Sequence, residues 1–163
     1  MKLKLEQDRM RLIERLGVHL EEKEQLAPLA ARIISTLILT GKKGVSFGEL
    51  VQNLSASKST ISTHLATLQA IKRIAYYTKP GDRKKYFIIP PEAKLRWIDE
   101  MIDKWTCERN IHQEIFEYKK QCNRNLSCSE DPKFELEIHK EYLKILSLAC
   151  ATMVDLREKV KTA

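Results

Sequence analysis

The sequence lacks a long hydrophobic run and any residue pattern typical of catalysis. Its longest apolar stretch, 26–39, is shorter than the roughly 20 residues that cross a bilayer, and it contains Arg32. Among its 5 glycines there is no loop that would cradle a phosphate, and no nucleophile stands beside a base. The sequence therefore favours neither a membrane protein nor an enzyme.

Cysteines are few, and their spacing is not that of a zinc site. Cys107, Cys122, Cys128 and Cys150 form no C-x-x-C pair, and no secretory signal opens the chain. We expect a cytoplasmic protein with reduced thiols and with neither metal nor cofactor. Cys122 and Cys128 flank a short loop, where two interpretations stay open: free structural thiols, which we favour, or a redox switch.

Acidic residues are scarce in the first half of the chain. The 29 basic and 22 acidic residues give a net charge of +7. Residues 1–91 hold 16 basic and 8 acidic side chains, whereas residues 92–163 hold 13 and 14. Within residues 42–91, 9 basic side chains accompany 2 acidic ones. We therefore expect a polyanionic partner to dock on that segment.

Hydrophobic periodicity predicts two helices at the start of the chain. Residues 3–24 form an amphipathic pattern in which Gly17 is the one disturbance, and this helix needs a partner surface. Pro28 suits the first turn of the next helix, and Gly41 ends its apolar run. This second helix is expected to be well buried.

A short helix and a longer one follow, joined by a tight turn. Ser46 and Glu49 have the spacing of a capping box, and the helix that they open ends near Leu54. Ser57 is placed to cap the second helix, which is predicted over residues 58–72. The pattern predicts a helix-turn-helix.

Aromatic and β-branched residues then predict a hairpin with a basic tip. The runs 74–78 and 85–89 are the strands, and Pro80 and Gly81 lie in the turn between them. A long helix is predicted to about Asn125, and a last helix from 131–132 to about 160. The expected fold is mainly α with a small β-hairpin wing: an amphipathic arm (1–26), a winged helix-turn-helix (27–91) and a helical region (92–163).

The second helix of the pair has the surface expected of a DNA-contacting helix. Its inward stripe is Ile61, Leu65 and Leu68, and no acidic residue occurs in 59–70. Small hydroxylated side chains would let this helix settle deep in a major groove, while the basic tip follows phosphates or a minor groove. The alternative is a merely solvated helix and loop. The candidate DNA-binding residues are Ser57, Lys58, Ser59, Thr60, Ser62, Thr63, Thr67, Lys79, Arg83, Lys84 and Lys85.

The order of these motifs resembles MarR-type transcription regulators, specifically their GbsR-like branch. The resemblance rests on 26–32, 46–50, 57–62 and 80–86, and it fades after Glu92. It implies a homodimer whose winged modules each read half of a pseudo-palindromic operator. It also implies that Asp82 orients Arg83 on the wing.

The terminal helices are predicted to form the dimer interface. The apolar face of the last helix is too broad for a lone surface helix. A second subunit and the first helix would cover it and would space the two DNA-contacting helices about 34 Å apart. The predicted interface residues are Leu16, Leu20, Ile138, Tyr142, Ile145, Ala149 and Leu156.

Function is thus predicted to be that of a sequence-specific DNA-binding transcription regulator, most simply a repressor. The other interpretations are a winged-helix module for protein assembly and a sensor that uses Cys122 and Cys128. Aromatic residues such as Trp97 and Trp105 favour helix packing over an effector pocket, although an unknown small effector stays open. His112 and His139 are interpreted as interface or surface residues and not as metal ligands.

Overall fold

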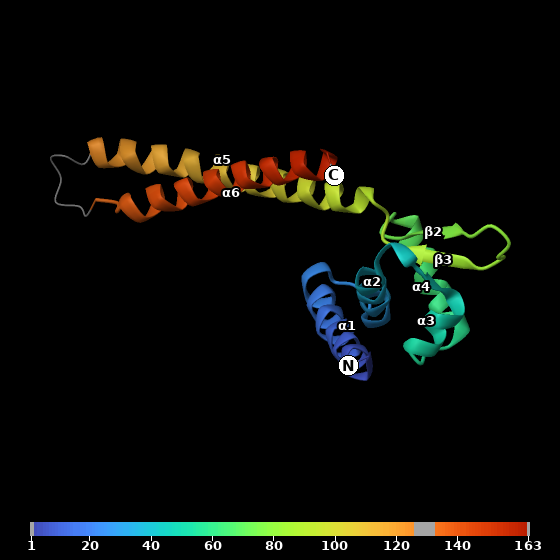
Figure 1. The fold of residues 1–163 in the computed structure, drawn as a ribbon. Helices are drawn as coiled ribbons and strands as arrows, with labels where there is room; N and C mark the ends of the chain where they lie inside the picture. The colour runs from blue at the N-terminus through green and yellow to red at the C-terminus, as the bar shows by residue number, and fades with distance from the viewer. Residues whose placement is uncertain (1, 126–132, 163) are drawn as a thin grey trace. The chain divides into compact units, whose positions relative to one another are not determined.

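The computed structural model describes residues 2–125 and 133–162, which form two compact units, 1–90 and 91–163 (Figure 1). The chain is mainly helical with one small antiparallel sheet, as the sequence predicts.

The first unit is a winged helix-turn-helix. Helices α3 and α4 are the helix-turn-helix, and strands β2 and β3 are the wing. A third strand, β1, pairs with β3 so that Val45 lies opposite Phe87, a pairing that was not predicted. The elements are α1 (Lys2–Glu24), α2 (Pro28–Thr40), the 3-10 turn η1 (Gly41–Lys43), β1 (Val45–Ser46), α3 (Phe47–Asn53), α4 (Lys58–Ala70), β2 (Ala75–Thr78) and β3 (Lys85–Ile88).

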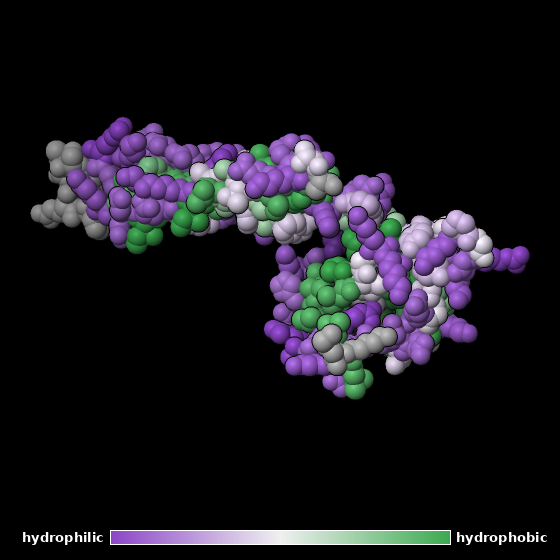
Figure 2. Space-filling view, viewed as in Figure 1, coloured by the Kyte–Doolittle hydropathy of each residue, from purple (hydrophilic) through white to green (hydrophobic). Residues whose placement is uncertain are grey.

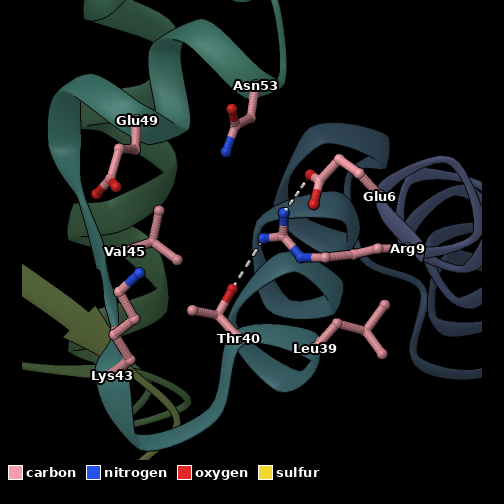
Figure 3. A pocket seen from close by; sticks show the side chains of 9 residues that line it. Glu6, Arg9, Leu39, Thr40, Lys43, Val45, Glu49 and Asn53 are labelled. Atoms are coloured by element: carbon pink, nitrogen blue, oxygen red, sulfur yellow. Dashed lines mark hydrogen bonds and ion pairs between the residues drawn. The ribbon is translucent and has the colours of Figure 1, made fainter. Parts of the chain in front are cut away.

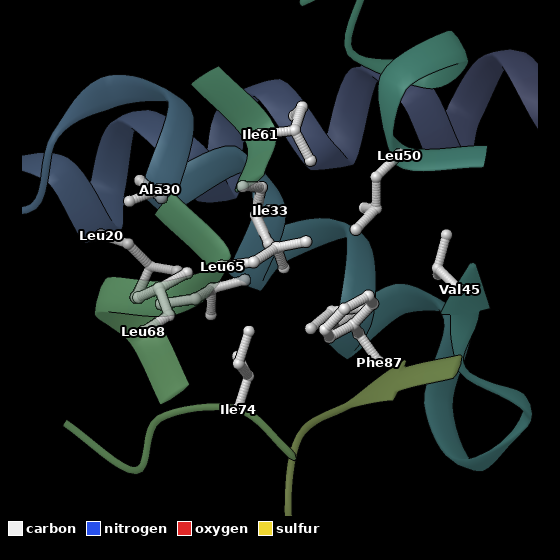
Figure 4. Close-up of a cluster of buried hydrophobic side chains, with 13 residues drawn as sticks. Leu20, Ala30, Ile33, Val45, Leu50, Ile61, Leu65, Leu68, Ile74 and Phe87 are labelled. Carbon is white, nitrogen blue, oxygen red and sulfur yellow. The ribbon is translucent and has the colours of Figure 1, made fainter. Parts of the chain in front are cut away.

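One apolar core joins every helix of this unit to the sheet (Figure 4). Helix α2 lies at the centre of this core. Its apolar residues recur at three- and four-residue steps, so they are buried on two sides of the helix. Helix α4 contributes the three predicted residues Ile61, Leu65 and Leu68, each at most 3% exposed. The inward side of α4 is therefore fixed, and its other side faces solvent.

Helix α1 packs on α2 of the same chain, which differs from the expected separate arm. Leu20 is buried in the core cluster and Leu16 packs against that cluster, so both serve the core of this unit instead of a free interface. Gly17 makes the approach possible, because a Cβ there would lie 2.9 Å from Cγ of Arg32. Arg32 in turn donates to Glu14 and Glu21 across the helix pair.

A glycine fixes the entry into β1. Gly44 has φ +70° and ψ 172°, a region open almost only to glycine. A Cβ on Gly44 would stand 2.9 Å from the backbone oxygen of Phe87 on β3. The short strand β1 can therefore pair with the wing only because residue 44 has no side chain.

The second unit is an antiparallel pair of long helices, α5 (Glu92–Asn125) and α6 (Glu137–Thr162). Its buried residues are Ile98, Leu143, Leu146, Cys150 and Met153. The predicted start of the last helix is wrong, because Lys133–Leu136 precede α6 without helical structure. Residues 128, 131 and 132 lie outside the described residues, as does any pairing of Cys128.

Within the described ranges, the structure contains no helix long and apolar enough to cross a membrane.

Candidate nucleic-acid interface

Two serine caps set the geometry of the helix-turn-helix. The backbone N–H and the hydroxyl of Ser46 donate to Oε2 of Glu49 at 2.7 and 2.6 Å, and the N–H of Glu49 donates back to Ser46 Oγ. These bonds hold the pKa of Glu49 below its usual value. Ser57 accepts from the N–H of Thr60 at 3.1 Å. Both predicted caps are confirmed, and they fix where α3 and α4 begin.

The outward side of α4 carries small side chains. We call this surface the α4 face: Ser59, Ser62, Thr63, Ala66, Thr67 and Ala70, all exposed. Its predicted members are therefore accessible, and so are Ser57, Lys58 and Thr60 at the start of the helix. The hydroxyl of Ser57 lies 2.9 Å from that of Ser59 and 2.7 Å from that of Thr60. These three hydroxyls form one polar cluster at the N-terminal end of α4.

Asp82 holds the turn of the wing together. Its carboxylate accepts from the phenol of Tyr86 at 2.7 Å and from the N–H of Lys84 at 2.9 Å. These two bonds lower the pKa of Asp82. Among the described residues, Tyr86 and Lys84 are the hydrogen-bond partners of the Asp82 carboxylate and Arg83 is not one of them, so the orienting of Arg83 by Asp82 stays a prediction. Tyr86, the residue that sequence reasoning missed, is four positions away across the turn.

Aromatic rings organise the basic side chains of the wing. Nζ of Lys79 lies 3.8 Å from the ring centre of Tyr86, and Nζ of Lys85 lies 4.3 Å from that of Tyr76. Tyr77 stacks on Tyr86 and donates its hydroxyl to the backbone oxygen of Lys43 at 2.8 Å. The sheet thus carries two lysines on ring faces and is tied to η1.

Arg83 and Lys84 are exposed and make no side-chain hydrogen bond or ion pair with any residue that the structure describes. Figure 1 shows the tip of the hairpin projecting from the part of the first unit where α3 and α4 lie, away from α1. The two predicted contact regions, the α4 face and the wing tip (79–84), are therefore both open to solvent in one unit. The acidic groups nearest to them, Glu49 and Asp82, are engaged in hydrogen bonds.

A polar pocket of the first unit lies elsewhere, between α1, the end of α2 and α3 (Figure 3). Arg9 crosses it and donates to Glu6 at 2.8 Å and to Thr40 Oγ1 at 3.0 Å. Glu49 on its wall is engaged by Ser46. Because Arg9 and Glu6 pair with each other and Glu49 is bonded to Ser46, we assign the pocket no part in the interface.

The second unit exposes apolar side chains along α6. Ile138, Ile145 and Leu148 are 71%, 63% and 70% exposed. Figure 2 shows apolar side chains at the surface of this helix pair among hydrophilic ones. The predicted interface residues Tyr142 and Leu156 are also exposed, while Ala149 is half-buried. This apolar surface is accessible, as a dimer interface requires.

A histidine pair joins α5 to α6, which sequence reasoning missed because it treated each histidine alone. Nδ1 of His112 lies 3.1 Å from Nε2 of His139. Glu108 lies 3.4 Å from the other ring nitrogen of His112 and accepts from the hydroxyl of Tyr142. Among residues 2–125 and 133–162, no group of three or more His, Cys, Asp or Glu residues could hold a metal ion. The pair is therefore a contact between helices.

The sequence is similar to part of one curated regulator whose name includes a helix-turn-helix. No family model matches the sequence. The HTH-type transcriptional regulator MmpR5 of Mycobacterium tuberculosis is 33% identical over 88 residues, which are 54% of this chain and 53% of MmpR5. The chain thus spans about half the length of the curated relative it matches. A solved structure described as that of a transcriptional regulator aligns with 95% of this chain and 94% of its own, with 23% identity and a TM-score of 0.49.

Neither name mentions the MarR-type or GbsR-like families, so that resemblance stays a prediction.

Proposed function

We propose that this chain is a DNA-binding transcription regulator that inserts α4 into a major groove and lays its wing on the neighbouring backbone or minor groove. One observation supports this most: the exposed α4 face carries no acidic residue, and it belongs to the same compact unit as the side chains of Arg83 and Lys84, which make no hydrogen bond or ion pair with the described residues. A phosphate backbone attracts such a surface and requires no acidic group to move away. The name of the relative MmpR5 points to the same role and not to catalysis.

The regulator acts as a homodimer on a pseudo-palindromic operator. Exposed Ile138, Ile145 and Leu148 on α6 support this part, because apolar side chains on one side of a helix are stabilised by burial against a second copy. Two copies would place two α4 helices about one duplex turn apart. Occupying an operator blocks polymerase, so repression is the simplest outcome. The cytoplasm, where a bacterial chromosome lies, is the proposed location.

The test is binding of the full chain to duplex DNA selected from a random library, measured by fluorescence anisotropy at several salt concentrations. We expect affinity to fall steeply with salt, with a slope of about −0.9 per phosphate contacted. Arg83→Ala should weaken binding to all duplexes, whereas Thr63→Ala should reduce the preference for the selected site. Arg11→Ala, at an exposed position of α1, is the control of equal charge change.

Two results would contradict the proposal. One is the absence of any selected duplex. The other is affinity unchanged by both Arg83→Ala and Thr63→Ala. Salt-insensitive binding of a protein through the same surface would instead support the assembly module.

A further inference from the structure

The α4 face offers a DNA duplex no long polar side chain. Every exposed residue from Ser59 to Ala70 is serine, threonine or alanine. His64 and Gln69 are half-buried and lie on the flanks beside the inward stripe. Arginine reads guanine and asparagine or glutamine reads adenine through paired hydrogen bonds, and the centre of this face has none of them. Base recognition must use shorter groups.

The two threonines at the centre of the face have already used their hydroxyl protons. Thr63 donates to the backbone oxygen of Ser59 at 3.0 Å, and Thr67 donates to that of Thr63 at 3.1 Å. A hydroxyl has one proton to donate, so toward DNA each threonine presents only oxygen lone pairs and a methyl group. Ala66 and Ala70 present methyl groups alone.

These groups match one kind of base pair. In the major groove a G·C pair shows the guanine acceptors, which a hydroxyl without a free proton cannot satisfy, and the cytosine amino group, from which its lone pairs can accept. An A·T pair also shows an amino donor, on adenine, but it alone adds the apolar thymine methyl group. We infer that α4 reads A·T pairs, chiefly by contact of the Thr63, Ala66 and Thr67 methyl groups with thymine methyl groups. This inference rests on the proposed function and names the DNA sequences that the surface prefers.

The wing favours the same sequences. A narrow minor groove, as in A-tracts, has an enhanced negative potential that attracts arginine. Arg83 is exposed at the hairpin tip without a hydrogen-bond or ion-pair partner among the described residues. Lys58, the long exposed cation of α4, lies at the first helical position on the edge of the face, next to the capping Ser57. There it contacts phosphate, so Lys58→Ala weakens binding equally for all sequences.

The experiment removes single thymine methyl groups from the DNA. The tightest duplex selected from a random library is remade with deoxyuridine in place of one thymine at a time, which leaves every hydrogen-bonding group in place. Affinity of the full chain is measured by anisotropy. We expect a loss of about fourfold at each contacted thymine, the effect of one buried methyl group, and no loss at thymines outside the two half-sites.

A matched protein variant tests the partner of each methyl. Thr63→Ser keeps the hydroxyl and removes only the methyl. On the selected duplex it should lose about fourfold, and on one deoxyuridine duplex it should lose nothing further, which shows that the two methyl groups touch. Thr162→Ser, at the exposed C-terminal end of α6, is the control and should bind every duplex like the wild type.

The outcomes separate this inference from the function on which it rests. Tight, salt-sensitive binding to half-sites specified by G·C pairs would overturn the inference and leave the regulator standing. Binding unaffected by deoxyuridine at every position would do the same. If no duplex is selected at all, the proposed function fails and the inference fails with it.

Discussion

The two units bury their apolar residues to very different extents. In the first unit, four helices and a sheet surround one core, and residues such as Ile33 and Leu50 are completely buried. In the second unit, two long helices share a single seam, and Ile145 and Leu148 on α6 stay largely exposed. The first unit has the core of an independently stable domain, whereas the second has apolar surface that a further chain would cover.

Under the proposed function, this difference separates two tasks. The unit that presents the α4 face and the wing would have to hold a fixed shape, which its core supports. The helix pair would have only to associate. We therefore expect substitutions in the first unit to act on folding and on DNA affinity, and substitutions on α6 to act on association.

The largest expected effect is that Gly44→Ala destabilises the first unit and leaves the second unit unchanged. The left-handed backbone and the contact with the backbone oxygen of Phe87 should together lower its free energy of unfolding by about 3 kcal/mol. In thermal unfolding of the full chain, circular dichroism should show a transition at lower temperature. The fluorescence of Trp97 and Trp105, both in α5, should keep the same midpoint temperature. Gly48→Ala, where a Cβ meets nothing within 4 Å, is the control. Equal midpoints for both variants would contradict the account of β1.

The next effect should be confined to the second unit. Ile145→Glu places a charge on the exposed apolar face of α6 and should weaken self-association by about 30-fold, the effect of losing one central interface residue. Sedimentation equilibrium measures the dissociation constant. Ala151→Glu, exposed on another side of the same helix, should associate normally. A wild-type chain that is monomeric at micromolar concentration would contradict self-association through α6.

A smaller effect is expected at the wing. Tyr86→Phe removes the hydroxyl that donates to Asp82 and should reduce DNA affinity by up to about tenfold without changing the core. Tyr76→Phe, whose hydroxyl makes no hydrogen bond within the described chain, is the matched control. Equal affinities of the two variants for the selected duplex would show that the Asp82 contact does not organise the wing.

The same contact gives a pH prediction. Hydrogen bonds from Tyr86 and from the N–H of Lys84 hold the pKa of Asp82 below 3.8. The contact therefore stabilises the wing fully above pH 3.8 and is lost as pH falls through the lower folded value. In Tyr86→Phe, carbon-detected NMR titration should show the Asp82 pKa moving up toward 3.8. No movement would mean that the phenol is not the main cause.

The smallest effect should appear in the second unit near neutral pH. Burial, with Lys119 and His112 nearby, lowers the pKa of His139 below 6.5. The unfolded chain then binds the proton more readily, so the helix pair loses stability as pH falls through 6.5 toward the folded value. Thermal melts followed by tryptophan fluorescence should show this slope. This dependence on pH should disappear in His139→Asn. It should persist in His19→Asn, a change at an exposed position of α1 in the first unit.

Local patterns predicted most of the fold. The capping box at Ser46 and the proline and glycine at the ends of α2 fixed helix boundaries within a residue or so, because these signals act over four residues or fewer. Strand β1 was missed because two residues carry no periodicity and pair with β3 far along the chain. The start of α6 was misplaced because Asp131 and Pro132 looked like a cap although the described helix begins at Glu137.

Part of the candidate site could likewise be predicted from local patterns, and part could not. The inward stripe of α4 follows from helical periodicity, so its exposed side could be deduced by elimination. The hydrogen-bond partner of Asp82 could not be deduced from the sequence, because the path of the turn decides whether the carboxylate meets Arg83 or Tyr86. Leu20 was assigned to a second chain because an amphipathic helix does not tell which surface covers it.

Gly17 gives helix α1 a mechanical role. With no side chain at residue 17, Arg32 lies close against α1 and reaches Glu14 and Glu21 on either side of it. Leu20 continues that attachment into the same core that holds Leu65 of α4. Helices α1 and α4 therefore share one core, so under the proposed function a molecule that binds the outer surface of α1 would act on a support of the helix that contacts DNA.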